Sequence, residues 1–442
     1  MPFIATVVLS LASQTSTSTV IDRLRDRGLT DLGAYEMLKD LTGKVGARVS
    51  GSNGADKAVL WVERQMKAIG LSNIQRVPCL VPHWERGNRE SLTISPGGEL
   101  SVCALGMSVG TPTKGVAGEV IEVKSLEEAA KLGRRAKGKI VFYNRPFDAK
   151  LASTFEAYGG AVDQRYGGAS VAAKNGAVAI LVRSMTQSRD DAPHTGAMGY
   201  EEGTPKIPAA AIGVRSAEKL SALLKRGSVK ARLQLSCKTL PDKMSANVIG
   251  EIPGSVSPEK IVAMGGHLDS WDLGTGAHDD GAGIVHAMEA VRLIKVLGLK
   301  PKMTIRVVAW MNEENGGRGA EAYAERVKRE PHYAAFESDS GGFMPRALGV
   351  SKSKLEYVQK WLPKLQQFGI ERFVEGGADA DNGPLEPLGA TLFSLIPDNQ
   401  RYFDVHHSRN DVIYNVHDRE LEFGAIAFAA LAWLVSEEGL GD

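Results

Sequence analysis

Histidine and carboxylate residues follow the apolar runs of the C-terminal half of the chain in a regular rhythm. They come after four runs with the composition of buried strands: His267 and Asp269 after 260–265, Glu313 and Glu314 after 303–310, Asp339 after 334–337, and His406 and His407 in the loop after 391–396. Asp279, between glycines, opens the helix that follows the first run. Mixed imidazole and carboxylate ligands suit zinc and its neighbours, whereas an all-oxygen set would favour calcium or magnesium.

Each of these residues alone has an ordinary explanation, because charged side chains are mostly exposed and a single histidine is usually structural. Their recurrence at consecutive strand ends, beside glycines, makes that explanation improbable. The pair Glu313-Glu314 directly ends a strand that reads as buried on both faces. Because neighbouring residues point in different directions, one glutamate can bind a metal while the other faces a water molecule.

The composition excludes several other classes of protein. With 53 Lys+Arg against 52 Asp+Glu, the net charge of +1 gives no general attraction to nucleic acid or to an anionic membrane. No apolar run approaches the roughly 18 residues of a membrane span. The cysteines (Cys79, Cys103 and Cys237) form no CxxC pair, so a thiolate zinc site or a redox site is not expected. One disulfide and three buried thiols both remain open. No GxSxG turn follows a strand, which argues against a serine hydrolase.

Strands alternating with helices must position these residues. Helices are expected at 281–297, 319–328 and 421–435, between and after the strands, and this alternation predicts an α/β sheet with helices on both faces. Ligands of such sheets bind beyond the carboxyl ends of the strands. Further upstream, apolar periodicity predicts a helix that begins near Asp31, a second helix at 55–70 and a strand at 74–81.

The length of 442 residues suggests two or three domains at about 150 residues each. The stretch 111–240 is rich in glycine and alanine, with strand-like runs at 139–143 and 178–182, and reads as a separate module inserted between 31–110 and 241–442. Residues 1–30 are expected to be a flexible segment. Its apolar run ends at Ser10-Leu11-Ala12, which has the form of a signal cleavage site, so a secreted or periplasmic location and a cytoplasmic one with a frayed tail both stay open.

Longer motifs resemble those of the zinc peptidases of family M28 over nearly the whole chain, most closely a carboxypeptidase branch. The stretches that carry the resemblance are Leu41-Thr42 through Ser50-Gly51-Ser52, residues 82–87, 193–196, 205–208 and 266–272, and His406-His407-Ser408. The resemblance implies the zinc exopeptidase fold, with a mixed central sheet flanked by helices on both faces. It also implies that 111–240 is a protease-associated domain and that the protein is a homodimer.

The same resemblance assigns roles to the individual residues. Asp279 would bridge two zinc ions, His267 and Asp339 would complete the ligands of one ion, and Glu314 and His407 those of the other. His407 is chosen over His406 because His407-Ser408-Arg409-Asn410-Asp411 fits the family's His-Ser/Thr-x-x-Asp, although Val412 departs from the usual threonine. Glu313 would be the general base, and Asp269 would orient His267. His406 stands where the family often has an oxyanion-stabilising tyrosine. A cis peptide bond between Asp279 and Asp280 is also implied.

The function predicted from these observations is that of a di-zinc exopeptidase acting on dipeptides and other small peptides, with a zinc-bound hydroxide as nucleophile. A carboxypeptidase needs an arginine or lysine for the terminal carboxylate, and Arg401 and Arg409 flank the last ligand. An aminopeptidase on the same scaffold is the first alternative. A receptor built on a degenerate peptidase domain is the second, but such a protein should have lost ligands or the base. Small peptides are the expected partners, with no nucleic acid and no membrane.

Overall fold

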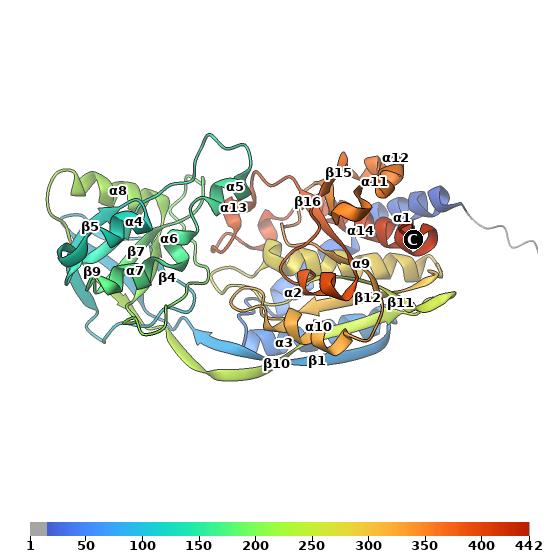
Figure 1. The fold of residues 1–442 in the computed structure, drawn as a ribbon, viewed down its shortest axis with the longest axis horizontal. Coiled ribbons are helices and arrows are strands. Elements are labelled where there is room, and N and C mark those ends of the chain that lie inside the picture. Colours follow the sequence, from blue (N-terminus) through green and yellow to red (C-terminus); the bar gives the residue numbers. More distant parts are fainter. Residues whose placement is uncertain (1–15, 442) are drawn as a thin grey trace, which may run out of the picture.

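The structure, a computed structural model, describes residues 16–441. Two lobes lie side by side along the long axis of the molecule (Figure 1). The inserted lobe comprises residues 90–235, and the main lobe comprises the rest of the described chain. A long antiparallel ribbon of β1 (Ser72–Glu85) and β10 (Lys238–Ile252) leads the chain from the main lobe to the inserted lobe and back. Each lobe is built around one sheet of eight strands.

The sheet of the main lobe has the order β1-β10-β12-β11-β13-β16-β14-β15. Its four central strands, β12, β11, β13 and β16, are mutually parallel, so their carboxyl ends meet at one edge as the sequence predicts. Strand β10 pairs antiparallel with both β1 and β12, and β14 pairs antiparallel with β16 but parallel with β15, which makes the sheet mixed. The remaining bounds are β11 Ser257–His267, β12 Met303–Trp310, β13 His332–Glu337, β14 Pro345–Val350, β15 Arg372–Glu375 and β16 Thr391–Pro397.

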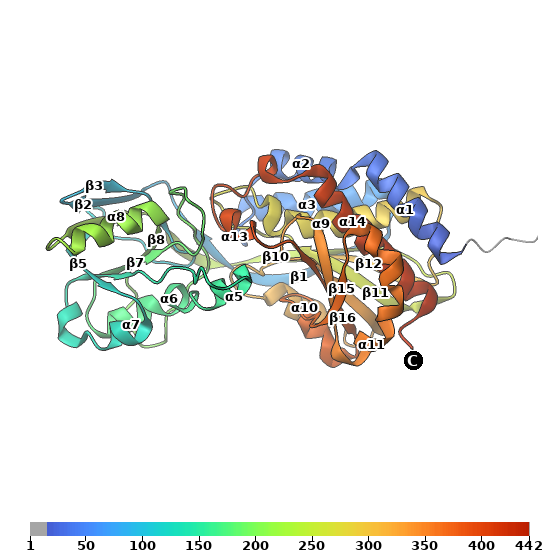
Figure 2. The same ribbon diagram turned by 90° about the horizontal axis from the view of Figure 1, so that it is seen from above.

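Helices cover both faces of this sheet (Figure 2). One face carries α2 (Gly33–Lys44), α3 (Asn53–Ile69), α9 (Ala282–Val296) and α14 (Asp418–Glu438), and the other carries α10 (Arg318–Val327) and the 3₁₀ turn η6 (Gly383–Leu388). The predicted α/β fold is confirmed. Short elements complete the lobe: η2 Ala277–Gly281, η3 Lys352–Lys354, α11 Leu355–Val358, η4 Gln359–Trp361, α12 Leu362–Leu365, η5 Gln366–Phe368, α13 Tyr402–Val405 and η7 Ile413–Asn415.

The prediction of a flexible segment over residues 1–30 is wrong for its second half, which forms α1 (Thr17–Asp31). Val20, Ile21 and Leu24 are buried, and the helix contacts α14 and α9. Their spacing marks one apolar helix face, a signal that the many polar residues around it obscured. Residues 1–15, with the predicted signal cleavage site at Ser10-Leu11-Ala12, lie outside the described residues.

The inserted lobe begins before the predicted boundary at residue 111. Residues 90–104, which the sequence analysis placed in the main lobe, form β2, β3 and β4 of the second sheet, with the order β3-β2-β9-β5-β6-β7-β8-β4. The change in composition near 111 therefore lies inside this lobe. The expected strands at 139–143 and 178–182 are β6 and β7. The bounds are β2 Glu90–Ser95, β3 Gly98–Leu100, β4 Val102–Ala104, β5 Val116–Val123, β6 Ile140–Tyr143, β7 Ala179–Arg183, β8 Ala209–Ile212, β9 Lys230–Leu235, α4 Leu126–Ala130, η1 Gly133–Ala136, α5 Thr154–Gly159, α6 Asp163–Tyr166, α7 Gly168–Lys174 and α8 Val214–Leu224.

The three cysteines are all buried free thiols. In the described part of the chain, no helix is both long and apolar enough to cross a membrane.

A buried pair of carboxyl groups lies between α9 and α14, away from the strand ends. Glu422 accepts a hydrogen bond from the backbone N–H of Ala34 at 3.0 Å, and its neighbour Glu289 has its carboxylate paired with Arg292 at 2.6 Å. Burial, together with the charge of Glu289, raises the pKa of Glu422 to about 8. Glu422 is therefore the protonated member of the pair at neutral pH.

We expect this pair to make the stability of the fold depend on pH. Because the folded state holds the proton on Glu422 more tightly than the unfolded chain does, its contribution is complete at acidic pH and is lost as the pH rises towards about 8. Glu422→Gln, which mimics the protonated acid, should abolish that part of the decline in melting temperature between pH 6 and pH 9. Glu36→Gln on the exposed side of α2 is the control. If the melting temperatures of Glu422→Gln and wild type fell by the same amount between pH 6 and pH 9, the expectation would be contradicted.

Candidate metal centre

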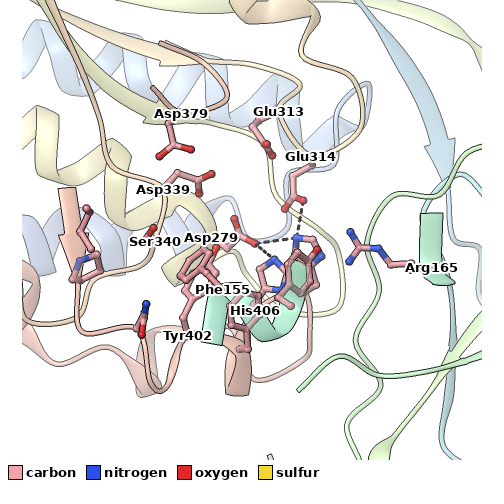
Figure 3. A pocket seen from close by; sticks show the side chains of 16 residues that line it. Phe155, Arg165, Asp279, Glu313, Glu314, Asp339, Ser340, Asp379, Tyr402 and His406 are labelled. Atoms are coloured by element: carbon pink, nitrogen blue, oxygen red, sulfur yellow. Dashed lines mark ion pairs between the residues drawn. The ribbon is translucent and has the colours of Figure 1, made fainter. Parts of the chain in front are cut away.

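The parallel strand ends bring the predicted ligand residues together, and four of them, Asp279, Glu314, Asp339 and His407, line one cavity (Figure 3), while His267 is buried against Asp279. His267 is the last residue of β11, Glu313 and Glu314 follow β12, and Asp339 follows β13. His407 follows α13, the helix that comes directly after β16 in the chain. The cavity has a volume of about 500 Å³. It is lined by Phe155, Tyr158, Arg165, Asp279, Glu313, Glu314, Asp339, Ser340, Asp379, Ile396, Pro397, Asn399, Tyr402, Phe403, His406 and His407.

Asp279 occupies the centre of the cluster. Its Oδ1 lies 3.1 Å from His267 Nε2, and its Oδ2 lies 3.2 Å from His407 Nε2. One carboxylate thus faces two imidazoles with different oxygens. The peptide bond between Asp279 and Asp280 is cis, as the resemblance implied.

The remaining ligand residues divide into two groups around Asp279. On one side, Asp339 Oδ1 lies 3.3 Å from His267 Nε2. On the other side, Glu314 Oε2 lies 3.0 Å from His407 Nε2. Glu313 Oε2 stands farther away, at 3.9 Å from His267 Nε2, and its side chain is the most exposed of these at 26%. These two pairs are those of the predicted assignment, and the ligand atoms of His267, Glu313 and Asp339 also lie within 4.8 Å of one another. The assignment to two metal ions stays a prediction.

The donor set fits divalent cations. Asp279 Oδ2 and Asp339 Oδ1 are buried without a hydrogen-bond donor among the described residues, although each faces an imidazole nitrogen. Burial, followed by the charges of neighbouring carboxylates, raises the pKa of Glu313, Glu314 and Asp339 to about 7 each. Carboxyl groups are packed here more densely than two imidazoles can compensate, and buried charges of one sign require a counter-charge. Two imidazoles and three carboxylates that meet in this way suit zinc.

Asp269 contacts His267, its predicted partner, through the main chain. His267 Nδ1 lies 3.0 Å from the backbone carbonyl oxygen of Asp269 and 3.9 Å from its carboxylate, so the main chain orients the ring. The carboxylate instead accepts hydrogen bonds from the N–H groups of Asn312, at 2.6 Å, and Glu313, at 3.1 Å, and from the Ser50 hydroxyl at 2.8 Å. Asp269 therefore fixes the backbone that carries Glu313.

Two further buried carboxylates hold the turn that carries Asp279. Asp280 accepts hydrogen bonds from the N–H groups of His267, at 2.9 Å, and Gly283, at 2.8 Å. Asp411 accepts from three successive N–H groups, those of residues 277–279, at 3.0, 2.6 and 3.2 Å. Asp411 ends the His-Ser-x-x-Asp motif that begins at His407, so this motif connects His407 to the turn that carries Asp279.

Arg48, in the turn between α2 and α3, lies fully buried behind the cluster. Its guanidinium donates to the carbonyl oxygens of Leu268 at 2.7 Å, Thr275 at 2.6 Å and Gly276 at 2.9 Å. It thereby joins the loop after His267 to the turn before Asp279. Arg48 lies in a stretch that carries the family resemblance, but its role could not be predicted because its contacts span more than two hundred residues of sequence.

His406 stacks on His407, with ring centroids 3.5 Å apart and planes inclined by 19°. Its Nε2 lies 3.8 Å from Asp279 Oδ2. Burial lowers the pKa of His406 well below its usual value, so the ring is neutral. Its role in stabilising an oxyanion stays a prediction.

The inserted lobe supplies part of the cavity wall. The N–H of Thr195 donates to the carbonyl oxygen of His407 at 2.9 Å, and Phe155, Tyr158 and Arg165 line the cavity. Gly196 is required here, because a Cβ atom would lie 2.3 Å from Arg165 Nη1 and 2.7 Å from His407 Nδ1, and its φ of +127° already favours glycine. Thr195 and Gly196 lie in a stretch that carries the family resemblance, whereas no sequence pattern marked Phe155, Tyr158 or Arg165.

The arginines that the sequence suggested for a terminal carboxylate do not line the cavity. Arg401 lies over the ring of Phe343 and pairs with Glu420 at 2.9 Å, and Arg409 is also absent from the cavity wall. The cavity has Arg165 instead, as Figure 3 shows. Proximity in sequence to the last ligand was a poor guide, because the loop directs these side chains elsewhere.

Comparison with known proteins gives consistent results. The sequence profile of peptidase family M28 matches residues 247–431. Carboxypeptidase Q from Bos taurus is 37% identical over 411 residues, covering 91% of this chain and 85% of that protein. Carboxypeptidase Q from Homo sapiens is 36% identical, covering 97% of this chain and 90% of that protein.

Two solved structures are similar over most of their length. The crystal structure of a peptidase M28 precursor from Shewanella amazonensis has a TM-score of 0.91 and 33% identity, covering 95% of this chain and 96% of that one. A zinc aminopeptidase from Bacillus subtilis shares the fold, with a TM-score of 0.64 and 21% identity, covering 90% and 94% of the two chains.

Proposed function

Since the chain belongs to peptidase family M28, we propose that it is a di-zinc exopeptidase that hydrolyses dipeptides and other small peptides with a free C-terminus. The full set of five ligand residues, together with Glu313, supports an active enzyme over a degenerate scaffold, because a complete metal site has no other evident use. The similarity to carboxypeptidase Q over most of both chains supports the carboxypeptidase direction.

His267 and Asp339 would hold one zinc ion, Glu314 and His407 the other, and Asp279 both. Zinc ions at such a pair activate a water molecule and polarise the scissile carbonyl. Glu313 is the remaining carboxylate, and its side chain faces the cavity. It takes the proton from the attacking water and passes it to the leaving amine. Asp269 holds the Glu313 backbone for this transfer.

The position of Arg165 is the single observation that supports a carboxypeptidase over an aminopeptidase. The residue is 7% exposed, its Nε and Nη1 donate to the carbonyl oxygens of Ala197 at 3.2 Å and Thr195 at 3.4 Å, and its guanidinium lies over the ring of Tyr158 at 5.5 Å. No carboxylate of the described chain lies within 4.0 Å of it. Because a buried guanidinium requires an anionic partner, the terminal carboxylate of a substrate is the natural counter-ion.

Blocking that carboxylate should therefore lower the rate. We expect C-amidated dipeptides to show a kcat/KM at least tenfold below that of the free acids, about 1.4 kcal/mol of lost transition-state stabilisation. In Arg165→Met the free acids should fall to the level of the amides, so that discrimination disappears. Arg135→Met, on the surface of the same lobe, is the matched control. Equal turnover of acids and amides by the wild type would refute the assignment.

An aminopeptidase is the second candidate, and Asp379 favours it. This carboxylate lines the cavity and lies in one group with Asp339 and Glu337, so it could receive the free amine of a substrate. Rapid hydrolysis of amino-acid p-nitroanilides, without loss when the carboxylate is absent, would establish this direction. N-acetylation alone decides little, because a dipeptide held at both ends would suffer from either block.

A further inference from the structure

Tyr402 has a hydroxyl group that the fold does not use. The residue begins α13 and is 4% exposed. Its ring is stacked on Phe155 with centroids 5.4 Å apart, and it contacts Phe403 at 5.2 Å and His406 at 5.1 Å. On another side Gly341 approaches so closely that a Cβ atom there would lie 3.1 Å from Tyr402 Cδ2. The ring is therefore held in one position by neighbours from both lobes.

The hydroxyl forms no hydrogen bond with any residue of the described chain. Other buried tyrosines do place this group on a protein partner: Tyr143 donates to the carbonyl oxygen of Gly168 at 2.8 Å, and Tyr323 bonds His332 Nε2 at 2.9 Å. A buried phenol normally finds such a partner. Tyr402 lines the catalytic cavity on the side of Asp279 and Ser340 (Figure 3), so its partner is to be sought among the molecules that enter this space.

The surroundings fix which role the hydroxyl can take. Burial, with the negative charges of Asp279 and Asp339, holds the pKa of Tyr402 well above its ordinary range. The phenol is therefore a neutral O–H group that donates a hydrogen bond and does not accept a proton as a base. His406, the other polar neighbour on α13, is a neutral ring that lies flat against His407.

We propose that the Tyr402 hydroxyl donates a hydrogen bond to the scissile carbonyl oxygen as that oxygen becomes negative. This inference rests on the proposed peptidase function. When the water oxygen bonds to the carbonyl carbon, the π electron pair of the carbonyl moves to its oxygen, and the water proton goes to Glu313. The phenol keeps its own proton throughout. A donor fixed in place before the reaction is favourable because no reorganisation is needed as charge develops. Tyr402 is thus a catalytic residue beside Glu313.

The test is Tyr402→Phe in the zinc-loaded protein, with a dipeptide as substrate. Phenylalanine keeps the ring contacts, so the melting temperature and zinc content should stay at the wild-type values. Because removal of one such donor costs about 10²–10³-fold in rate, kcat should fall by that factor while KM changes less than threefold. Tyr414→Phe, at a residue 91% exposed on η7, removes a hydroxyl outside the cavity and should leave kcat unchanged.

A binding measurement makes the result independent of turnover. A phosphinic dipeptide, with a tetrahedral phosphorus in place of the scissile carbon, should bind Tyr402→Phe about 10–100-fold more weakly than wild type. A kcat within threefold of wild type, or unchanged phosphinate affinity, would overturn the role of Tyr402 and leave the proposed function intact. A zinc-loaded wild type that hydrolyses no dipeptide would instead overturn the proposed function itself.

Discussion

Replacing Glu313 by glutamine should lower kcat by about 10²–10⁴-fold while both metal ions remain bound. Glu313 Oε2 is 3.9 Å from His267 Nε2, farther than the oxygens of Asp279 at 3.1 Å and Asp339 at 3.3 Å, and its side chain faces the cavity. Glutamine keeps the size of the side chain but cannot take the proton of the attacking water. The measurements are kcat on a dipeptide and the zinc content of the purified variant.

The adjacent residue provides a sharp control. Glu314 Oε2 lies 3.0 Å from His407 Nε2, and its Oε1 accepts a hydrogen bond from the N–H of Trp271 at 3.2 Å. Glu314→Gln should therefore weaken one metal ion, and added zinc should restore part of the activity. If Glu313→Gln loses zinc and Glu314→Gln keeps it, the two assignments are reversed.

Removal of metal should abolish activity altogether. We expect about two zinc ions per chain in the purified protein, reversible inactivation by a chelator, and recovery on addition of zinc. The metal-free protein should also melt at a lower temperature, because ligands that bind only the folded state stabilise it. Elemental analysis and calorimetry on the same sample measure both effects. Full activity with at most one tightly bound ion would refute the dinuclear site.

Much of the centre could be predicted from the sequence because its ligands follow consecutive parallel strands. Local pattern identifies the strands, and parallel order brings their ends to one edge, so His267, Glu313, Glu314 and Asp339 could be grouped without a structure. His407 required the additional motif that ends at Asp411. The same reasoning failed for α1, whose three buried residues stand among polar ones.

The residues that sequence reasoning missed act across long separations. Arg48 binds carbonyl groups more than two hundred residues away, and Arg165 reaches the cavity from the other lobe. Tyr402 was overlooked because its value lies in an unused hydroxyl, which only the packing of its ring reveals. Periodicity and spacing describe residues that are close in the sequence. These roles depend on tertiary contacts between segments that are far apart in the sequence.

The contribution of the inserted lobe to the cavity has a consequence for the order in which the site can be assembled during translation. Residues 90–235 leave the ribosome long before His406 and His407, and domains generally fold in that order. The surface that receives the last histidine, including the Thr195 N–H, can therefore exist before that histidine is synthesised. Zinc can therefore meet its complete set of predicted ligands only after His407 has left the ribosome.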